Sequence, residues 1–117
     1  MANEIIEFNN SVNVDGKIVA SSTMKATNFL LGSDERLKTN IEPLRAVPLN
    51  VEYKEFELLS EPNQLRFGVI AQDLQKEHPE LVRTDDNGML SVAYIDLLIK
   101  EIVFLKNKVA ELEKRIG

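Results

Sequence analysis

The sequence predicts an α+β fold, in which a small mixed globular unit of β-hairpins and short helices lies between a strand-rich N-terminal segment and a long C-terminal coiled-coil helix. Three observations support this. Apolar and polar residues alternate near the N-terminus, strand and helix periods are mixed in the middle, and apolar residues recur every three or four positions at the end. With 117 residues, the chain fits one ordinary domain. We divide it into residues 1–32, 33–94 and 95–117.

Composition excludes several classes of function. Nineteen acidic and fourteen basic residues give a net charge of -5, which repels nucleic-acid phosphates and anionic lipids. No apolar run approaches the ~20 residues that span a bilayer, and no cysteine is available for disulfides or thiolate metal sites. There is also no glycine-rich phosphate loop and no cluster of metal ligands. We therefore expect a soluble cytoplasmic chain with no cofactor, metal, nucleic-acid partner or membrane partner.

The N-terminal segment has the texture of strands. Val12 and Val14 alternate with polar residues, Asp15-Gly16 is typical of a tight hairpin turn, and Ile18-Val19 resumes the pattern. Polar residues outnumber apolar ones, so the segment buries little by itself. We interpret it as the remnant of a larger β structure whose partner strands come from elsewhere.

The globular unit begins with a short helix or turn. Ser33-Asp34-Glu35-Arg36 offers a capping hydroxyl followed by acids in the first turn. Leu37, Ile41 and Leu44 could form an apolar stripe before Pro48 ends the element.

Two hairpins and a short helix are predicted next. Residues 51–54 and 65–71 have the character of strands, with Glu61-Pro62-Asn63 as the turn between them. Residues 72–77 form a helical turn that Pro79 ends.

The second hairpin joins residues 81–82 to residues 89–92 through Asp85-Asp86-Asn87-Gly88. This loop lacks the alternating ligands and terminal glutamate of a calcium loop, so we interpret it as a turn. His78, the only histidine, has no second imidazole or cysteine with which to share a metal, and we interpret it as structural. Aromatic residues of the unit are expected to be core or subunit contacts: Phe56, Phe67 and Tyr94.

The C-terminal region carries the clearest periodic signal. Its apolar residues form a seam at spacings of three and four: Ile95, Leu98, Ile102, Leu105, Val109, Leu112 and Ile116. An isolated helix has nothing against which to bury this seam, so we expect association rather than intramolecular packing. β-branched residues at the first seam position with leucine at the second favour two parallel strands, so the pattern by itself indicates a dimer.

Three blocks together resemble a known family. They are Ser33-Asp34-Glu35-Arg36-Leu37-Lys38-Thr39-Asn40-Ile41, then Gly68-Val69-Ile70-Ala71-Gln72-Asp73, then Leu90-Ser91-Val92-Ala93-Tyr94 before the C-terminal helix. In this order they resemble the intramolecular chaperone, auto-processing domain of phage endosialidases, tail fibres and neck appendages, which is also called the S74 peptidase family. The resemblance runs from Ser33 to Gly117.

The resemblance implies a function. Such domains form homotrimers at the C-terminus of β-rich fibres, help three client chains to intertwine, and release themselves by autoproteolysis. Residues 1–32 would then be the C-terminal end of the client stalk, an N-terminal part of the same chain. We expect the domain to act in the host cytoplasm during virion assembly, leaving the client in the virion tail.

The resemblance also implies a single-turnover serine endopeptidase with a Ser33/Lys38 dyad. A serine hydroxyl needs a base, and a lysine serves as one only when it is neutral, which requires burial or cationic neighbours. In a continuous helix the two side chains would lie on different faces, so a turn or a neighbouring subunit must bring them together. The resemblance implies cleavage of the Ser33–Asp34 bond, whereas attack by Ser33 on its preceding carbonyl would break Gly32–Ser33.

An alternative remains open. Without the resemblance, Ser33 would be interpreted as a helix N-cap and Lys38 as a solvated surface charge. The chain would then be a structural trimerisation tip of a phage fibre that never cleaves.

Overall fold

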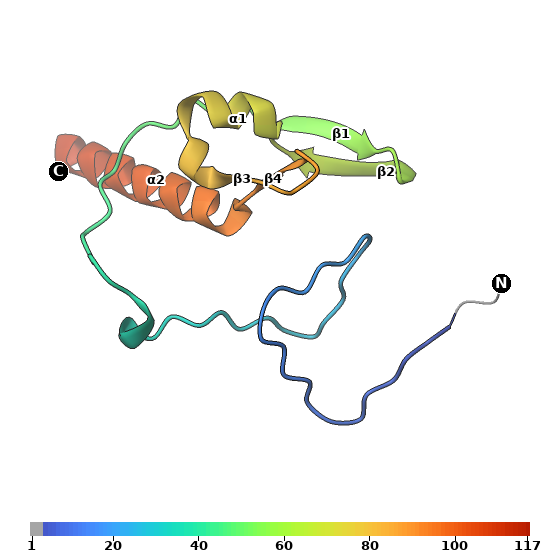
Figure 1. The fold of residues 1–117 in the computed structure, drawn as a ribbon. Helices are drawn as coiled ribbons and strands as arrows, with labels where there is room; N and C mark the ends of the chain where they lie inside the picture. The colour runs from blue at the N-terminus through green and yellow to red at the C-terminus, as the bar shows by residue number, and fades with distance from the viewer. Residues whose placement is uncertain (1–3) are drawn as a thin grey trace. The chain divides into compact units, whose positions relative to one another are not determined.

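The computed structural model describes residues 4–117, and the chain divides into two compact units, residues 1–40 and residues 41–117. Met1–Asn3, which begin the expected client segment, lie outside the described residues. The second unit contains both two-stranded sheets and both α-helices of the described residues (Figure 1). This mixture of two small antiparallel sheets with a long C-terminal helix confirms the mixed fold class.

The expected strands of the N-terminal segment do not form in the part that the structure describes. Residues 4–32 contain no strand (Figure 1), and all of them are exposed. Asp15-Gly16 forms a bend, in which Gly16 has a φ of 136°, but no ladder forms across it. The physical reason is that one polar-rich hairpin buries too little apolar surface to be stable in water.

The predicted helix at the start of the globular unit is a single 3₁₀ turn, η1, Glu35–Leu37. Asp34, rather than Ser33, is its N-cap, since the Asp34 carboxylate accepts a hydrogen bond from the backbone N–H of Arg36. The predicted apolar stripe is absent from residues 38–50, which are not helical. Pro43 explains this, because a proline forces the residue before it into extended conformation.

The first hairpin pairs β1, Lys54–Leu58, with β2, Glu61–Gly68, in antiparallel register. The predicted turn is wrong by a few residues, because Glu61, Pro62 and Asn63 lie within β2 and the chain reverses at Leu59-Ser60. The register shifts between Phe56 and Leu58, and Asn63 has a positive φ of 68°. Its backbone N–H donates to the Glu57 carboxylate, a local bond that stabilises this bulged pairing.

The next elements follow the prediction closely. Helix α1, Ala71–Glu77, has His78 as its C-cap, and the 3₁₀ turn η2, Pro79–Leu81, begins with the proline. Strand β3, Val82–Thr84, pairs antiparallel with β4, Leu90–Val92. In the connecting loop the Asp85 carboxylate accepts from the backbone N–H groups of Asn87 and Met89, and Gly88 takes a φ of 80°. These bonds are those of a hairpin turn.

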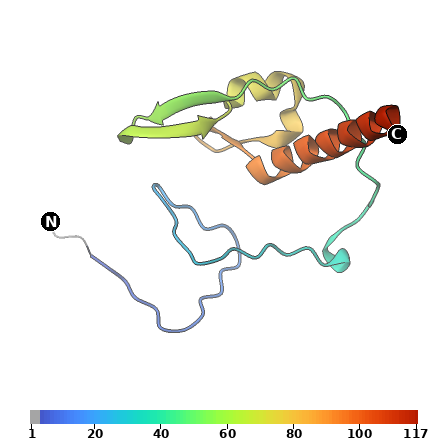
Figure 2. The ribbon, with the colours of Figure 1, turned by 180° about the vertical axis from the view of Figure 1, so that it is seen from behind.

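The core of the second unit gathers around Leu97, which is completely buried. Leu97 belongs to helix α2, Tyr94–Ile116, and η2 lies between α1 and the start of this helix (Figure 2). Four further buried residues complete the core: Val69, Leu74, Leu81 and Val82. The sequence did not single out Leu97, because it lies one position away from the seam residue Leu98.

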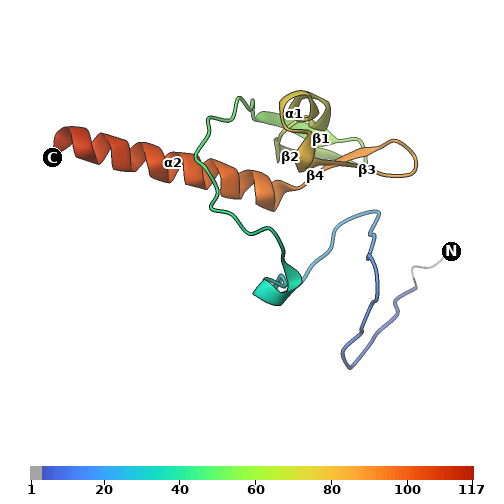
Figure 3. The same ribbon diagram turned by 60° about the vertical axis from the view of Figure 1, so that its left-hand side comes forward.

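Only the first half of α2 packs on this core. From Leu105 to Gly117 every residue is exposed, and the end of the helix extends away from the two hairpins (Figure 3). The predicted C-terminal helix is therefore confirmed as a helix. Among residues 4–117, no helix combines the length and apolar character that a membrane crossing would need.

Candidate functional site

The structure brings Ser33 and Lys38 together. The Nζ atom of Lys38 donates a hydrogen bond to Oγ of Ser33 at 2.7 Å. Of the two routes considered from the sequence, a turn within the chain is therefore sufficient for contact. The line joining these two atoms is also the path along which a neutral lysine would take the serine proton.

The η1 turn produces this contact. The backbone N–H of Leu37 bonds to the carbonyl of Asp34, and that of Lys38 bonds to the carbonyl of Glu35, both at 3.0 Å. Lys38 itself is extended, with φ -123° and ψ 153°. A tight 3₁₀ turn followed by an extended residue directs the lysine side chain back towards Ser33, which a continuous helix would not do.

A carboxylate–guanidinium pair lies beside the contact. Nε and Nη2 of Arg36 donate to Oδ1 and Oδ2 of Asp34 at 3.0 and 2.8 Å. These bonds, with the backbone N–H of Arg36, hold the pKa of Asp34 below its usual range, and the carboxylate raises the pKa of Arg36. Both groups are thus charged at neutral pH.

Ser33 and Lys38 are both solvent-exposed in the single chain. Exposure favours the protonated form of a lysine, because water solvates the charge. The contact therefore supplies the geometry of a serine–lysine pair, while the burial that such chemistry needs is not supplied by the first unit itself.

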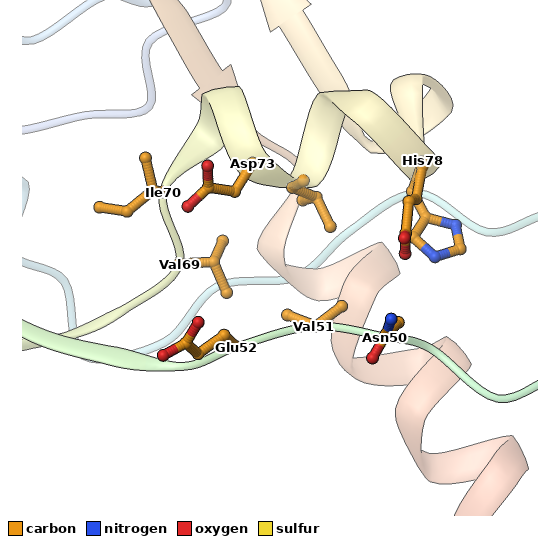
Figure 4. Close-up of a pocket in the computed structure, with 9 residues that line it drawn as sticks. Asn50, Val51, Glu52, Val69, Ile70, Asp73 and His78 are labelled. Carbon is orange, nitrogen blue, oxygen red and sulfur yellow. The ribbon is translucent and has the colours of Figure 1, made fainter.

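The second unit contains a cavity of about 280 Å³ between α1 and the extended segment before β1. Figure 4 shows Glu52 and Asp73 at one end of it and Asn50 and His78 at the other. Among residues 4–117, no three acidic or histidine side chains are grouped to hold a metal ion. Sequence reasoning missed Asn50 and Glu52, because only tertiary packing brings their segment opposite α1.

His78 lies at the edge of a charged pair. Its Nδ1 is 3.4 Å from the carboxylate of Glu80, which Lys100 of α2 also contacts at 3.0 Å. The backbone N–H of Glu80 and then the Lys100 ammonium lower the pKa of Glu80. Because this pair ties η2 to α2, a structural interpretation of His78 fits its surroundings.

The second and third sequence blocks meet at Gly68 and Tyr94. The backbone N–H of Val69 donates to the Tyr94 hydroxyl at 3.0 Å. A Cβ atom on Gly68 would collide with that hydroxyl and would lie 3.2 Å from Cζ of the same ring. Gly68 therefore leaves room for the tyrosine that joins the first hairpin to α2. Tyr94 is 40% exposed and Phe67 is 69% exposed, so neither is a core residue.

Replacing Gly68 by alanine is expected to lower the free energy of unfolding by about 1–3 kcal/mol, the usual cost of overpacking. Urea unfolding followed by circular dichroism measures it. As a control, Gly68→Ala is also made in a Tyr94→Phe protein, which lacks the obstructing oxygen. There the alanine should cost less stability. An equal loss in both backgrounds would show that the hydroxyl is not the obstacle.

Tyr53 anchors the segment before β1 to α2, since its hydroxyl donates to the Glu101 carboxylate at 2.8 Å. Burial and then the Glu101 carboxylate raise the pKa of Tyr53 to about 12. Because the folded-state pKa lies above the unfolded value of about 10, stability from this group is complete below pH 10 and is lost as the pH rises to about 12.

We expect Tyr53→Phe to have a shallower fall in the free energy of unfolding between pH 10 and about pH 12 than the wild type, measured by denaturant titration. The difference should be small, because Tyr53 is 49% exposed and water screens its interaction with Glu101. Comparison with the wild type at each pH removes the contribution of lysine titration. If the free energies of unfolding of the two proteins fall in parallel with pH, the raised pKa of Tyr53 is contradicted.

Comparison with known proteins identifies the segment that contains the Ser33–Lys38 contact. Residues 33–83 match the sequence model of a family described as "Chaperone of endosialidase". This segment belongs to the chaperone of endosialidase family. The match includes η1, the first hairpin, α1 and most of β3, so Ser33, Lys38 and Gly68 all fall within the family region.

Curated relatives extend over almost the whole chain. The long tail fiber protein Gp37 of Enterobacteria phage T2 is 33% identical over an alignment covering 93% of this chain and 10% of that protein. Gp37 of Enterobacteria phage K3 is 33% identical over 87% of this chain and 9% of its own length. The chain thus spans about a tenth of these relatives. No solved structure matches the chain.

Proposed function

We propose that this chain is the C-terminal intramolecular chaperone of a phage tail fibre, which trimerises through α2 and then cuts itself from its client near Ser33. The single observation that carries the cleavage is the 2.7 Å hydrogen bond between Lys38 Nζ and Ser33 Oγ. The family of residues 33–83 and the tail-fibre relatives support the chaperone role. In this proposal residues 1–32 are the end of the client stalk.

The proposed reaction is an acyl shift followed by hydrolysis. Neutral Lys38 takes the proton of the Ser33 hydroxyl, and Oγ attacks the carbonyl carbon of Gly32 through a five-membered ring. The Gly32–Ser33 C–N bond breaks, the nitrogen takes the proton back from Lys38, and an ester joins Gly32 to the serine oxygen. Water then hydrolyses the ester to a Gly32 carboxylate and the Ser33 hydroxyl.

The scissile bond follows from ring size. Attack by Ser33 on its own carbonyl would require a strained four-membered ring, so cleavage of Ser33–Asp34 would need the serine of another subunit. The mass of the released fragment distinguishes the two, because the product begins with Ser33 in one case and with Asp34 in the other.

The exposed face of α2 supports assembly. All seven seam residues are at least half exposed in the single chain, from Leu98 at 50% to Ile116 at 87%. Ile102, Leu105 and Val109 line an open, mainly apolar groove of about 500 Å³. Burying one such side chain contributes about 1.5–3 kcal/mol of stabilising free energy, so association of subunits through this face would be favourable. We propose a parallel trimeric coiled coil, the state that the family implies, in place of the dimer that the heptad pattern favours.

Assembly also offers the missing burial. Ser33 and Lys38 are exposed in one chain, and a neighbouring subunit or the client could cover them. In this hypothesis cleavage depends on assembly, so a fibre is released only after its three chains are joined. We propose that this takes place in the host cytoplasm during virion assembly, after which the client remains in the virion tail and the chaperone is released.

The same exposure favours a second candidate, a structural trimerisation tip that never cleaves. The test is intact-mass spectrometry of the wild type over time, beside Ser33→Ala, with light scattering to count subunits. Loss of mass at Ser33 in the wild type alone, from a trimer, supports the self-cleaving chaperone. If the wild type and Ser33→Ala both stay uncut, the result supports the structural trimerisation tip.

A further inference from the structure

The contact between Ser33 and Lys38 needs an interaction that restrains the lysine side chain. The two residues are five positions apart in an exposed segment, and a lysine side chain has many rotamers when nothing restrains it. A three-residue 3₁₀ turn is too short to be stable on its own backbone hydrogen bonds. Some side-chain interaction must therefore favour the turned conformation.

The Asp34–Arg36 pair provides a side-chain interaction that favours the turn. One carboxylate accepts three hydrogen bonds from a residue two positions ahead, from the backbone N–H of Arg36 at 2.9 Å and from its Nε and Nη2 atoms. In an extended strand residues 34 and 36 would share a face, so the guanidinium bonds alone do not select the turn. The bond from the backbone N–H of Arg36 to the Asp34 carboxylate is that of an Asx turn, and it requires the chain to turn. The backbone bond is an N-cap, and the two guanidinium bonds hold the capping carboxylate in place.

We propose that Asp34 and Arg36 are positioning residues for the self-cleavage reaction, which hold η1 so that Lys38 reaches Ser33. This rests on the proposed function, because it concerns the same serine–lysine pair. In the proposed cleavage of Gly32–Ser33, neither residue contributes a reacting atom. Arg36 also pairs with the Asp34 carboxylate, which is adjacent to Ser33. Without this pairing, the Asp34 carboxylate would attract the Lys38 ammonium away from the serine hydroxyl.

The first experiment measures the self-cleavage rate of the full chain against pH, by intact mass, for the wild type, Asp34→Ala, Arg36→Ala and the double variant. Each single substitution should slow cleavage by about tenfold. The double variant should be no slower than the slower single one, because the two residues act as a unit.

Two variants provide matched controls. Glu35→Ala removes an acidic side chain that makes none of the side-chain hydrogen bonds of this turn, and it should cleave like the wild type. Asp34→Asn keeps one capping oxygen and should recover part of the rate. Light scattering of every variant separates a change in rate from a change in assembly.

The second experiment measures geometry without cleavage. Nuclear Overhauser contacts between the ε protons of Lys38 and the β protons of Ser33 should appear in the wild type and Glu35→Ala and disappear in Asp34→Ala. Persistence of the contact in Asp34→Ala, or a wild-type cleavage rate in that variant, would overturn the positioning role while self-cleavage stands. Wild-type cleavage by Ser33→Ala would instead overturn the proposed function.

Discussion

Replacing Ser33 by alanine is expected to stop the proposed self-cleavage, with a fall in rate of more than about a thousandfold, as when the nucleophile is removed from a serine peptidase. The alanine side chain has no oxygen to attack a carbonyl, and the hydrogen bond that Lys38 Nζ makes to Ser33 Oγ is lost with it. Intact-mass spectrometry of the purified protein over hours to days measures the result.

Lys38 provides the complementary test. Lys38→Arg keeps the positive charge and most of the length, but a guanidinium does not give up its proton in the accessible pH range, so it cannot act as a base. We expect it to be as inactive as Ser33→Ala. Thr39→Ala, which removes a different hydroxyl from the same segment, is the control that should still cleave. Cleavage by Lys38→Arg would show that Lys38 is not the base.

Replacing Leu105 by aspartate is expected to convert the proposed trimer into monomers. Leu105 is 59% exposed in the single chain, so the substitution leaves the folded unit intact. In a trimer it would place three carboxylates together on the coiled-coil axis, and desolvating each costs several kcal/mol. Multi-angle light scattering measures the subunit number, and circular dichroism verifies the fold.

Lys114→Asp is the control, since it introduces a carboxylate outside the seam and should leave the subunit number unchanged. A Leu105→Asp variant that stays trimeric would contradict the seam as the interface. A wild-type dimer would favour the heptad pattern over the family resemblance. If assembly supplies the burial that Lys38 needs, the monomeric variant should also lose self-cleavage.

Local chemistry was enough to predict several elements. Pro79 ends α1 as expected, because a proline lacks the N–H that a helix interior requires. Asp85 and Gly88 form the predicted hairpin turn through a carboxylate that accepts backbone N–H groups and a glycine at positive φ. The C-terminal helix was predicted from a period of three and four. In each case the residues that carry the prediction lie within a few positions of the helix end or turn that they specify.

Local signals were misleading where partners lie far apart. Glu61-Pro62-Asn63 has the composition of a turn, yet pairing with β1 places it in a strand. The alternating residues of the N-terminal segment predicted strands, but no segment among residues 4–117 pairs with residues 4–32. In both cases hydrogen bonding to another segment, or its absence, outweighs intrinsic preference.

By itself, the sequence determined the helix of the last region, the exposed apolar seam on it, the second hairpin, and the residue types of the Ser33/Lys38 pair. Only the tertiary structure decided that Leu97 fills the core, that Gly68 makes room for Tyr94, and that Asp34, not Ser33, caps the η1 turn. The physical reason is that periodicity and turn chemistry act over a few neighbouring residues. Burial and side-chain hydrogen bonds depend on where the folded backbone places atoms that the sequence order leaves undetermined.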